Sequence, residues 1–417
     1  MTVPPDQDII RCHEFEELNL RISAEIADQD VLFIQREFGT KIKIRVELRD
    51  GHRICVLNPN QYVGVLSLPS GCKLEIHSKV RAQNILYMLS FADGLPWPFL
   101  DEHEHFERLD ELLEILAELF AARVADLMEA GLYRAYAEEE ENLRFVRGRI
   151  QFADDLRLNA LNRHRTFCAF SELTWDTDEN QILRSTLNYL SGLGFAHDLR
   201  LEIAALENQM EEVSLKSGRP FSNYRLHYHR MNEHYRPLHA MCRLFLEGAS
   251  ISEEHGNWIS SCFLVDMNDL FERYVSTLLR SQCPSHLDLM IQRRVPFIHP
   301  ANISVQPDLL VANRDVILLP LDCKYKRGGE SIAEADLYQL LAYCIVTQSP
   351  YGVLIFPEEP RFSDSELPVI HSEVRLLMKG LRLEAPLAEF IELGKELAGS
   401  VFRIAERIAQ GELQTVA

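Results

Sequence analysis

The stretch QPDLLVANRDVILLPLDCKYK, residues 306–326, places two carboxylates at the ends of two apolar segments. Asp308 precedes the first segment, Asn313-Arg314-Asp315 has the composition of a turn, and Asp322 ends the second segment. In an antiparallel hairpin, residues at similar distances from the turn face each other. Asp308 lies six residues before Arg314 and Asp322 lies eight after it, so both carboxylates are predicted to meet at one end of a sheet.

Lys324 adds a positive charge beside this pair. Side chains alternate between the two faces of a strand, so Asp322 and Lys324 share one face and Cys323 points to the other. Two carboxylates can hold one or two Mg²⁺ ions, which activate a water molecule and neutralise the charge that develops during phosphodiester hydrolysis. A nearby lysine can orient the water or stabilise the transition state. The stretch therefore predicts a Mg²⁺ site with Asp308 and Asp322 as ligands and Lys324 as a catalytic group, while Cys323 is expected to be a packing residue.

Polar residues on two flanking helices are candidates for the same site. An amphipathic pattern predicts a helix at 266–281, and Glu272 on it is the candidate for a third metal-binding acid. A second helix is predicted at 334–347, where Gln339 and Tyr343 have the i,i+4 spacing of one helix face. If these side chains point into the cleft, they belong to the catalytic site. The alternative is that both helices are ordinary amphipathic helices whose polar side chains face solvent.

Local patterns along the chain predict an α+β multidomain protein. Short β-branched segments predict strands in the first 80 residues, at 31–35, 41–48, 53–57, 62–68 and 73–77. Helical periodicity predicts helices in the middle of the chain, at 105–130, 178–194 and 198–213. The last region is predicted to contain strands at 288–292, 303–312, 315–323, 351–356 and 370–376 and a helix at 385–409. We expect a β-rich domain at 1–95, a helical region with a charged insertion at 96–235, and an α/β domain at 236–417.

The charge of the chain is unevenly distributed. The 417 residues carry 63 acidic and 43 basic side chains, a net charge of −20, which predicts weak binding of the isolated chain to DNA. Residues 101–142 hold 14 acids against three arginines, a net of −11. Residues 143–166 then hold six arginines, including Arg144, Arg147 and Arg149, against two acids. This change of sign indicates a functional surface, and a solvated charged face is an equally good interpretation.

Several classes of protein are excluded by composition and motifs. Nine scattered cysteines without a C-x-x-C pair argue against a disulfide framework, a zinc ribbon and an iron–sulfur cluster. No signal-peptide pattern and no apolar run of about 18 residues is present, which favours a cytoplasmic protein without a membrane partner. The one Gly-Lys pair, Gly394-Lys395, is preceded by Glu389 where a phosphate-binding loop needs glycine. A nucleotide-driven motor would therefore have to come from a partner.

The candidate residues occur in the order that is typical of a known nuclease superfamily. Glu272, Pro307-Asp308, Asp322-Cys323-Lys324 and Gln339 to Tyr343 resemble the motifs of the PD-(D/E)XK superfamily, in particular its RecB-like branch. Cys323 departs from that pattern, where a small residue such as alanine is expected. Over nearly all its length the chain also resembles the McrC family, the nuclease subunits of McrBC modification-dependent restriction systems. The segments that carry this resemblance are YVGVLSLPSGCKLEIHSKV (62–80), GLYRAYAEEEENLRFVRGRIQF (131–152), WDTDEN (175–180), LFERYV (270–275) and LDCKYKR (321–327).

The resemblance implies a division of labour with a partner. That partner would be an AAA+ GTPase ring, McrB-like, which reads methylated cytosine and moves DNA. The N-terminal half of this chain would dock in the ring and stimulate GTP hydrolysis, and the C-terminal restriction endonuclease-like domain would cut double-stranded DNA with Mg²⁺. A trans-acting arginine can stabilise a transferring phosphoryl group. Arg144, Arg147 and Arg149 are therefore the candidates for contact with the partner GTPase.

Two other functions are compatible with parts of the sequence. One is a RecB-like nuclease of another restriction or repair system, which would share the site but act without a GTPase ring. The other is a non-catalytic adaptor that only activates a motor. An adaptor would be expected to have lost part of its acid set, whereas Asp308, Asp322 and Lys324 are all present.

Overall fold

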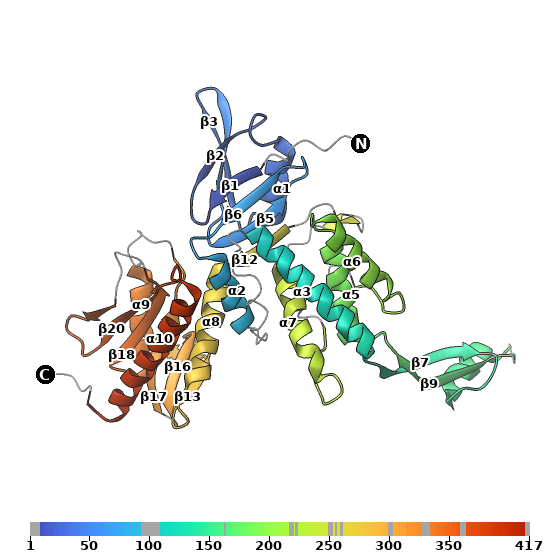
Figure 1. Cartoon of the computed structure of the whole chain (residues 1–417). Coiled ribbons are helices and arrows are strands. Elements are labelled where there is room, and N and C mark those ends of the chain that lie inside the picture. Colours follow the sequence, from blue (N-terminus) through green and yellow to red (C-terminus); the bar gives the residue numbers. More distant parts are fainter. Residues whose placement is uncertain are drawn as a thin grey trace. The chain divides into compact units, whose positions relative to one another are not determined.

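The structure is a computed structural model with several separate sheets and ten α-helices in the part of the chain that it describes (Figure 1). It describes residues 9–92, 109–161, 164–216, 221, 224–248, 253–254, 257–258, 262–298, 303–314, 316–326, 334–358 and 364–412. Contacts divide the chain into two compact units, Met1–Leu113 with Gly248–Ala417, and Glu114–Glu247. The mixture of helices and separate sheets agrees with the predicted α+β class. Within the described residues, no helix combines the length and the apolar character that crossing a membrane requires.

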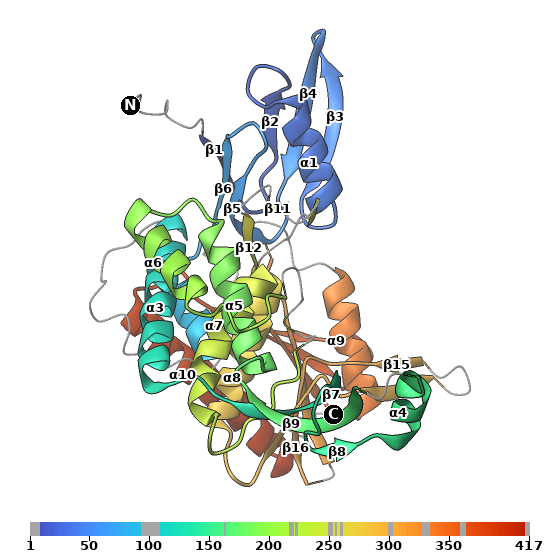
Figure 2. The same cartoon turned by 90° about the vertical axis from the view of Figure 1, so that its right-hand side faces the viewer.

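The N-terminal part of the first unit contains two sheets and two helices (Figure 2). The first sheet has the order β1 (Ile9–His13), β6 (Lys73–His77), β5 (Tyr62–Ser67), β12 (Cys262–Asp266), and only β1 and β6 are parallel. The second has the order β2 (Leu18–Arg21), β4 (His52–Asn58), β3 (Lys43–Arg49). The helices are α1 (Asp28–Phe38) and α2 (Ala82–Ala92). Four of the five predicted N-terminal strands are confirmed as β3, β4, β5 and β6.

The fifth prediction, a strand at 31–35, is wrong, because this segment lies within α1. Val31, Ile34 and Phe38 are buried at spacings of three and four residues, which is one face of a helix. Asp28 and Asp30 lie in the first turn, where acidic side chains stabilise the helix dipole. The short run VLFIQ fits the period of a strand as well as that of a helix. The residues on either side of it are needed to predict the helix.

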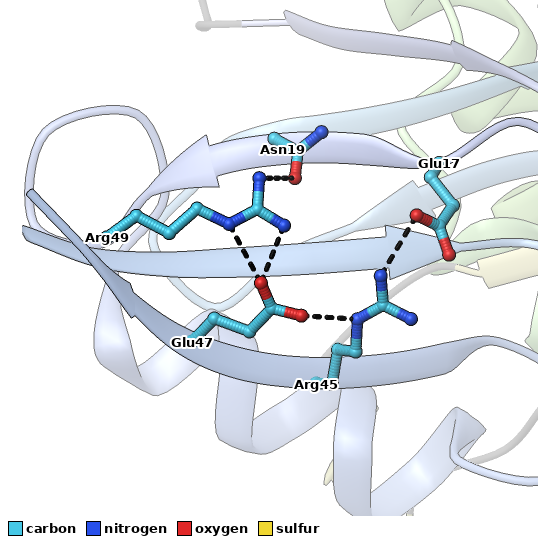
Figure 3. Close-up of polar contacts among 5 residues, drawn as sticks. All are labelled: Glu17, Asn19, Arg45, Glu47 and Arg49. Atoms are coloured by element: carbon cyan, nitrogen blue, oxygen red, sulfur yellow. Dashed lines mark hydrogen bonds and ion pairs between the residues drawn. The ribbon is translucent and has the colours of Figure 1, made fainter.

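The exposed face of the second sheet is covered by paired charges, as Figure 3 shows. The Arg45 guanidinium lies 2.7 Å from the Glu47 carboxylate and 3.0 Å from that of Glu17. Arg49 contacts the same Glu47 at 2.6 Å and donates a hydrogen bond to Asn19 Oδ1 at 3.3 Å. The arginines of this face therefore already have acidic partners within the sheet.

Gly64 allows β12, from far along the sequence, to pair with β5. Its φ is +150°, and a Cβ atom there would lie 1.9 Å from the carbonyl oxygen of Phe263 on β12. We expect Gly64→Ala to lower the free energy of unfolding by about 3 kcal/mol or more, because the backbone of β12 would have to move. Thermal unfolding would measure the change. Gly51→Ala is the control, because φ is also positive there but the added methyl group meets nothing within 4 Å. Equal effects of the two substitutions would contradict the steric explanation.

The second unit contains four longer helices and a small sheet. The helices are α3 (Leu109–Ala130), α5 (Asp178–Ser191), α6 (His197–Asn208) and α7 (Arg236–Gly248), and a 3-10 turn (Glu233–Tyr235) precedes α7. The three helices predicted in this region are confirmed. The sheet has the order β7 (Ala135–Leu143), β9 (Thr166–Thr174), β8 (Arg149–Ile150), and α4 (Phe152–Asn159) follows β8. Strand β7 was not predicted because it contains the acidic run 138–141, which is not typical of a strand. The residues paired with this run on β9, 168–171, include no acid, so the pairing places no two acids opposite each other.

The two units group residues differently from the three predicted domains. The predicted boundary at 95/96 lies outside the described residues. The boundary at 235/236 assigned α7 to the last domain, whereas α7 belongs to the second unit, where Phe245 packs against Phe120 of α3 with ring centroids 5.7 Å apart. Pairing of β12 with β5 joins the N-terminal and C-terminal regions into one unit, a long-range contact that local patterns do not reveal.

The C-terminal region contains a six-stranded sheet with helices packed on it. Its order is β13 (Asp288–Ile291), β16 (Leu309–Asn313), β17 (Val316–Cys323), β18 (Tyr351–Pro357), β20 (Arg375–Leu381), β19 (Ser365–Pro368). The helices are α8 (Met267–Gln282), α9 (Glu334–Thr347) and α10 (Leu387–Ala409). Leu354 and Phe356 pack under α9, while Val353 and Ile355 are buried on the opposite face. Both faces of the sheet are therefore covered.

Two details of this region correct the prediction. The predicted strand at 303–312 is interrupted at residues 306–308 and forms β15 (Ile303–Val305) and β16, and β15 pairs with β14 (Val295–Ile298). The predicted strand at 370–376 is wrong over most of its length, because the chain turns there and the strand begins at Arg375. His371 has a φ of +59° in this turn. The two-residue strands β10 (Glu253–Glu254) and β11 (Asn257–Trp258) also pair.

Candidate active site

The hairpin of β16 and β17 brings Asp308 and Asp322 together. Leu309 pairs with Leu321, so the residue before Leu309 and the residue after Leu321 meet at the same end of the ladder. The backbone N–H of Cys323 donates a hydrogen bond to Asp308 Oδ2 at 2.7 Å. A register shift after Val311 accounts for the unequal distances of the two aspartates from the turn. The juxtaposition predicted from the sequence is thus found, although the bulge was not predicted.

The two carboxylates lie in a poorly solvated environment. Burial and the nearby Asp322 carboxylate raise the pKa of Asp308 to about 6, against the hydrogen bond from Cys323 and the charge of Lys324. Asp322 is fully buried, and this burial raises its pKa although the positive charge of Lys324 opposes the shift. Two acids that share a buried site resist simultaneous ionisation. Carboxyl groups whose pKa is raised by burial and by a neighbouring acid are candidates for a functional site.

The two oxygens of Asp322 have different surroundings. Oδ2 forms an ion pair with Lys324 Nζ at 2.9 Å, whereas no donor among the described residues reaches the buried Oδ1. An unsatisfied buried carboxylate is costly. Mg²⁺ commonly binds through one or two carboxylates and keeps several waters. The facing pair Asp308 and Asp322 therefore fits such an ion.

Glu272 lies close to this pair but is held by a different partner. Its Oε1 accepts a hydrogen bond from Gln292 Nε2 at 2.8 Å. Burial, followed by the charge of Asp308, raises the pKa of Glu272. Within the described part of the chain, no three His, Cys, Asp or Glu side chains converge as a metal-binding group. The structure thus brings two of the three predicted ligands face to face and leaves Glu272 beside them.

Lys324 keeps its proton in this environment. Burial alone lowers the pKa of a lysine, but the charges of Asp322 and Asp308 outweigh this effect and raise the pKa of Lys324 above its ordinary value. Its backbone N–H donates to Ile355 O at 2.9 Å on the neighbouring strand, which fixes the backbone that carries it. Lys324 is therefore a fixed positive charge beside the two aspartates. Cys323 is buried, as its position on the opposite face of the strand predicts.

Gln339 and Tyr343 support the backbone that carries Asp308. Gln339 Nε2 donates to the Tyr343 hydroxyl at 2.6 Å, and that hydroxyl donates to the carbonyl oxygen of Gln306 at 3.2 Å. Tyr343 is only 3% exposed, and burial followed by the charge of Asp322 raises its pKa to about 12. It is thus a neutral donor at working pH. The predicted i,i+4 pair is confirmed as a contacting pair, and it contacts the segment two residues before Asp308.

A buried glutamate of the N-terminal region contacts the strand that carries the candidate site. The hydroxyl of Tyr325 donates to Glu14 Oε1 at 2.8 Å, and Ser78 Oγ and the Lys79 N–H donate to the same oxygen at 2.9 and 3.1 Å. Glu14 is 1% exposed, and burial raises its pKa. No sequence signal distinguishes Glu14 from the acids at 16 and 17, because the contact spans most of the chain. The ion pair of Lys326 with Asp336 on α9 was also not predicted, although these residues are only ten positions apart.

The three predicted partner-contact arginines lie in the second unit, where Arg144 follows the end of β7, Arg149 begins β8 and Arg147 lies in the connection between these strands. The guanidinium of Arg147 stacks 4.1 Å from the ring of Phe170 and lies 3.3 Å from the Glu172 carboxylate. Arg144 and Arg149 are exposed on either side of it. A planar guanidinium on an aromatic ring is held in one orientation. Arg147 is therefore the most constrained of the three arginines.

Comparisons with known proteins identify the family of the chain. The chain matches the model of the McrBC 5-methylcytosine restriction system component family over residues 57–357. The type IV methyl-directed restriction enzyme EcoKMcrBC of Escherichia coli (strain K12) is 24% identical over 289 residues, which are 63% of this chain and 80% of that protein.

Solved structures of relatives also match. A half-complex from the tetradecameric assembly of Thermococcus gammatolerans McrB AAA+ hexamers with bound McrC matches with a TM-score of 0.59 and 19% identity, over 95% of this chain and 100% of the matched chain. The Thermococcus gammatolerans McrBC complex matches with a TM-score of 0.43 and 20% identity, over 66% of this chain and 88% of that chain. The first of these supports the fold. The chain belongs to the family of McrBC 5-methylcytosine restriction system components, which confirms the resemblance to McrC drawn from its motifs.

Proposed function

We propose that this chain is the Mg²⁺-dependent DNA endonuclease subunit of a GTP-driven, modified-cytosine-dependent restriction complex. The observation that carries the proposal is the facing pair Asp308 and Asp322, with Lys324 Nζ 2.9 Å from the second carboxylate. Membership of the McrBC family supplies the context of DNA restriction. The C-terminal sheet and its helices would then be a PD-(D/E)XK nuclease domain.

Each residue of the site has a proposed role. Asp308 and Asp322 would hold the Mg²⁺ ion, which when bound supplies charge neutralisation and a water of lowered pKa for phosphodiester hydrolysis. Glu272, beside the pair, is the proposed third acid. Lys324 retains its proton and offers a positive charge to the phosphate oxygens. Tyr343, together with Gln339, holds the backbone that precedes Asp308.

The partner in this proposal is an AAA+ GTPase ring, McrB-like, and the contact includes the β7–β9 hairpin. In the solved relative, McrC is bound to McrB AAA+ hexamers. Near the three arginines, Phe145 and Val146 are 67% and 59% exposed, and further large apolar side chains are exposed on the same sheet and on α4. Apolar surface combined with arginine is typical of protein interfaces. We propose that Arg144, Arg147 and Arg149 contact the partner and stimulate GTP hydrolysis there.

The metal site is expected to link stability to pH. A folded-state pKa of about 6 for Asp308, against 3.8 in the absence of the fold, means that between these pH values the folded state keeps a proton that the unfolded state loses. Stability contributed by this group is therefore lost as the pH rises through this window. Asp308→Asn is expected to raise Tm at pH 8 by roughly 2–4 °C and to change it little below pH 4.

Addition of Mg²⁺ provides the second half of this prediction. At pH 8 the ionised pair binds the cation, so Mg²⁺ is expected to raise the Tm of the wild type but not that of Asp308→Asn. At pH 5 the proton competes with the metal, and the stabilisation by Mg²⁺ should be smaller. Thermal unfolding of both proteins at the two pH values, with and without Mg²⁺, measures these effects. Equal stabilisation of both proteins by Mg²⁺ at pH 8 would exclude Asp308 as a ligand.

Three functions are separated by one cleavage experiment. Wild-type chain is mixed with cytosine-methylated or unmethylated duplex DNA, with and without the GTPase partner and GTP. The proposal predicts cleavage only of methylated DNA and only with partner and GTP. Cleavage of unmethylated DNA without the partner would instead favour a RecB-like nuclease of another system. Stimulated GTP hydrolysis without any cleavage would favour a non-catalytic adaptor.

A further inference from the structure

We propose that Arg293 and Arg294, in the connection between β13 and β14, form a phosphate-binding clamp that holds a DNA strand beside Asp308. This inference rests on the proposed nuclease function and adds a DNA contact to it. The ligand is the phosphodiester backbone, which is recognised by charge and by bidentate hydrogen bonds from guanidinium groups.

The ladder places the two arginines next to the candidate site. Ile291 at the end of β13 pairs with Leu309, and the Gln292 N–H donates to the carbonyl oxygen of Asp308 at 2.8 Å. Arg293 and Arg294 follow directly. Gln292 has a φ of +47°, a left-handed conformation that is costly for a residue other than glycine. The chain thus bends at the residue opposite Asp308 and continues into the arginine pair.

The position of Arg294 is fixed by the segment that carries Asp308. Arg294 Nε donates to Gln306 Oε1 at 3.2 Å, and the carbonyl oxygen of the same Gln306 accepts the hydrogen bond from Tyr343. The connection between β13 and β14 is therefore attached to both Gln306 and Asp308. An anion bound by the guanidinium would lie beside the segment that presents the Asp308 carboxylate.

Both arginines are available to an anion. Their side chains are exposed, and among the described residues neither has a carboxylate at ion-pairing distance. In the part of the chain that the structure describes, the polar contact of Arg293 is with the sulfur of Met290, at 2.8 Å. Arg45 and Arg49 on the N-terminal sheet show the opposite arrangement, because Glu17 and Glu47 neutralise them (Figure 3). Arg293 and Arg294 thus differ from Arg45 and Arg49 in lying next to the candidate site and in having no acidic partner among the described residues.

The site needs such positive charges in order to admit DNA. The chain has a net charge of −20, and the candidate site itself holds Asp308, Asp322 and Glu272. Lys324 supplies one positive charge there, and part of this charge is balanced by Asp322. A polyanionic strand that approached these acids would be repelled unless further cations contacted its phosphates. Each phosphate contact contributes a slope of about 0.9 to the dependence of log K on log salt concentration.

The test uses the double variant Arg293→Gln/Arg294→Gln and a matched control. Arg314→Gln removes the same charge from an exposed arginine in the β16–β17 turn, at the end of the hairpin away from Asp308. Each protein is combined with the GTPase partner, GTP and methylated duplex DNA, and kcat/KM for cleavage is measured over a range of salt concentrations. Partner GTP hydrolysis is recorded in the same samples as a test of folding and assembly.

The clamp predicts a defined set of changes. The double variant should lose about 10-fold in kcat/KM and its salt slope should fall by about 2, while its GTPase stimulation and its half-maximal Mg²⁺ concentration stay at wild-type values. Arg314→Gln should behave as wild type. An unchanged salt slope in the double variant would overturn the clamp. A changed Mg²⁺ requirement together with an unchanged salt slope would show that the arginines act on the carboxylates and not on DNA. Absence of cleavage by the wild type would overturn the nuclease assignment itself.

Discussion

Replacement of Asp322 by Asn is expected to slow DNA cleavage by about 10³-fold or more, because a neutral amide cannot hold the cation or face Lys324 as a carboxylate does. The substitution keeps the shape of a side chain that is fully buried. It removes the ion pair with Lys324, but it also removes a buried charge, and burial disfavours the ionised form of Asp322 strongly enough to raise its pKa. The variant should therefore fold, and its Tm without metal should equal or exceed that of the wild type. Cleavage rate, Tm and partner GTP hydrolysis are measured on the same preparation.

Asp288→Asn is the matched control for this substitution. Asp288 begins β13 opposite Ala312, at the end of the sheet away from the candidate site, and its side chain is exposed. The control removes one negative charge from the same sheet and should leave cleavage unchanged. If Asp322→Asn cleaved DNA at the rate of the wild type, this carboxylate would not be part of the catalytic site.

Replacement of Arg144, Arg147 and Arg149 together by Ala is expected to abolish stimulation of the partner GTPase. An arginine that acts in trans on a transferring phosphoryl group contributes about 10³-fold or more. Among the single variants, we expect Arg144→Ala or Arg149→Ala to have the largest effect on the GTPase rate. Arg147 is held between Phe170 and Glu172, an arrangement that suits a supporting role better than direct contact with a nucleotide.

The backbone around these arginines offers an independent variant. Gly148 has a φ of +66°, and a Cβ atom there would lie 2.4 Å from the carbonyl oxygen of Ala169. Gly148→Ala should therefore displace the loop and reduce GTPase stimulation without removing any charge. Arg157→Ala on α4 is the charge control, because Arg157 pairs with Asp154 on the same helix and should be dispensable. Undiminished stimulation by all three single arginine variants would end the proposal.

The parts of the candidate site that come from neighbouring segments of the chain could be predicted from the sequence. Asp308 directly precedes β16, Asp322 lies near the end of β17 and Lys324 directly follows it, so alternation and hairpin geometry are enough to bring them together. Gln339 and Tyr343 contact each other because helix periodicity places i and i+4 on one face. The bulge after Val311 left no recognisable signal in this sequence and was not predicted.

The remaining features depend on contacts between distant segments. Residues far apart in the sequence are joined by the pairing of β12 with β5 and by the hydrogen bond from Tyr325 to Glu14. The local periodicity of hydrophobic residues does not predict such contacts. The segment 31–35 was predicted incorrectly because a short apolar run fits both a strand and a helix. Strand β7 was missed because four consecutive acids resemble a solvated segment, although on β7 they face uncharged partners.

We propose that Asp308 and Asp322 form the metal-dependent site of a DNA endonuclease. The most direct test of this proposal is cleavage of methylated duplex DNA by the complex with the GTPase partner, comparing wild type with Asp308→Ala while GTP turnover is followed in the same reaction. We expect both complexes to hydrolyse GTP at the same rate and only the wild type to cut. Equal cleavage by both, or cleavage by neither while GTP is turned over, would contradict the proposal.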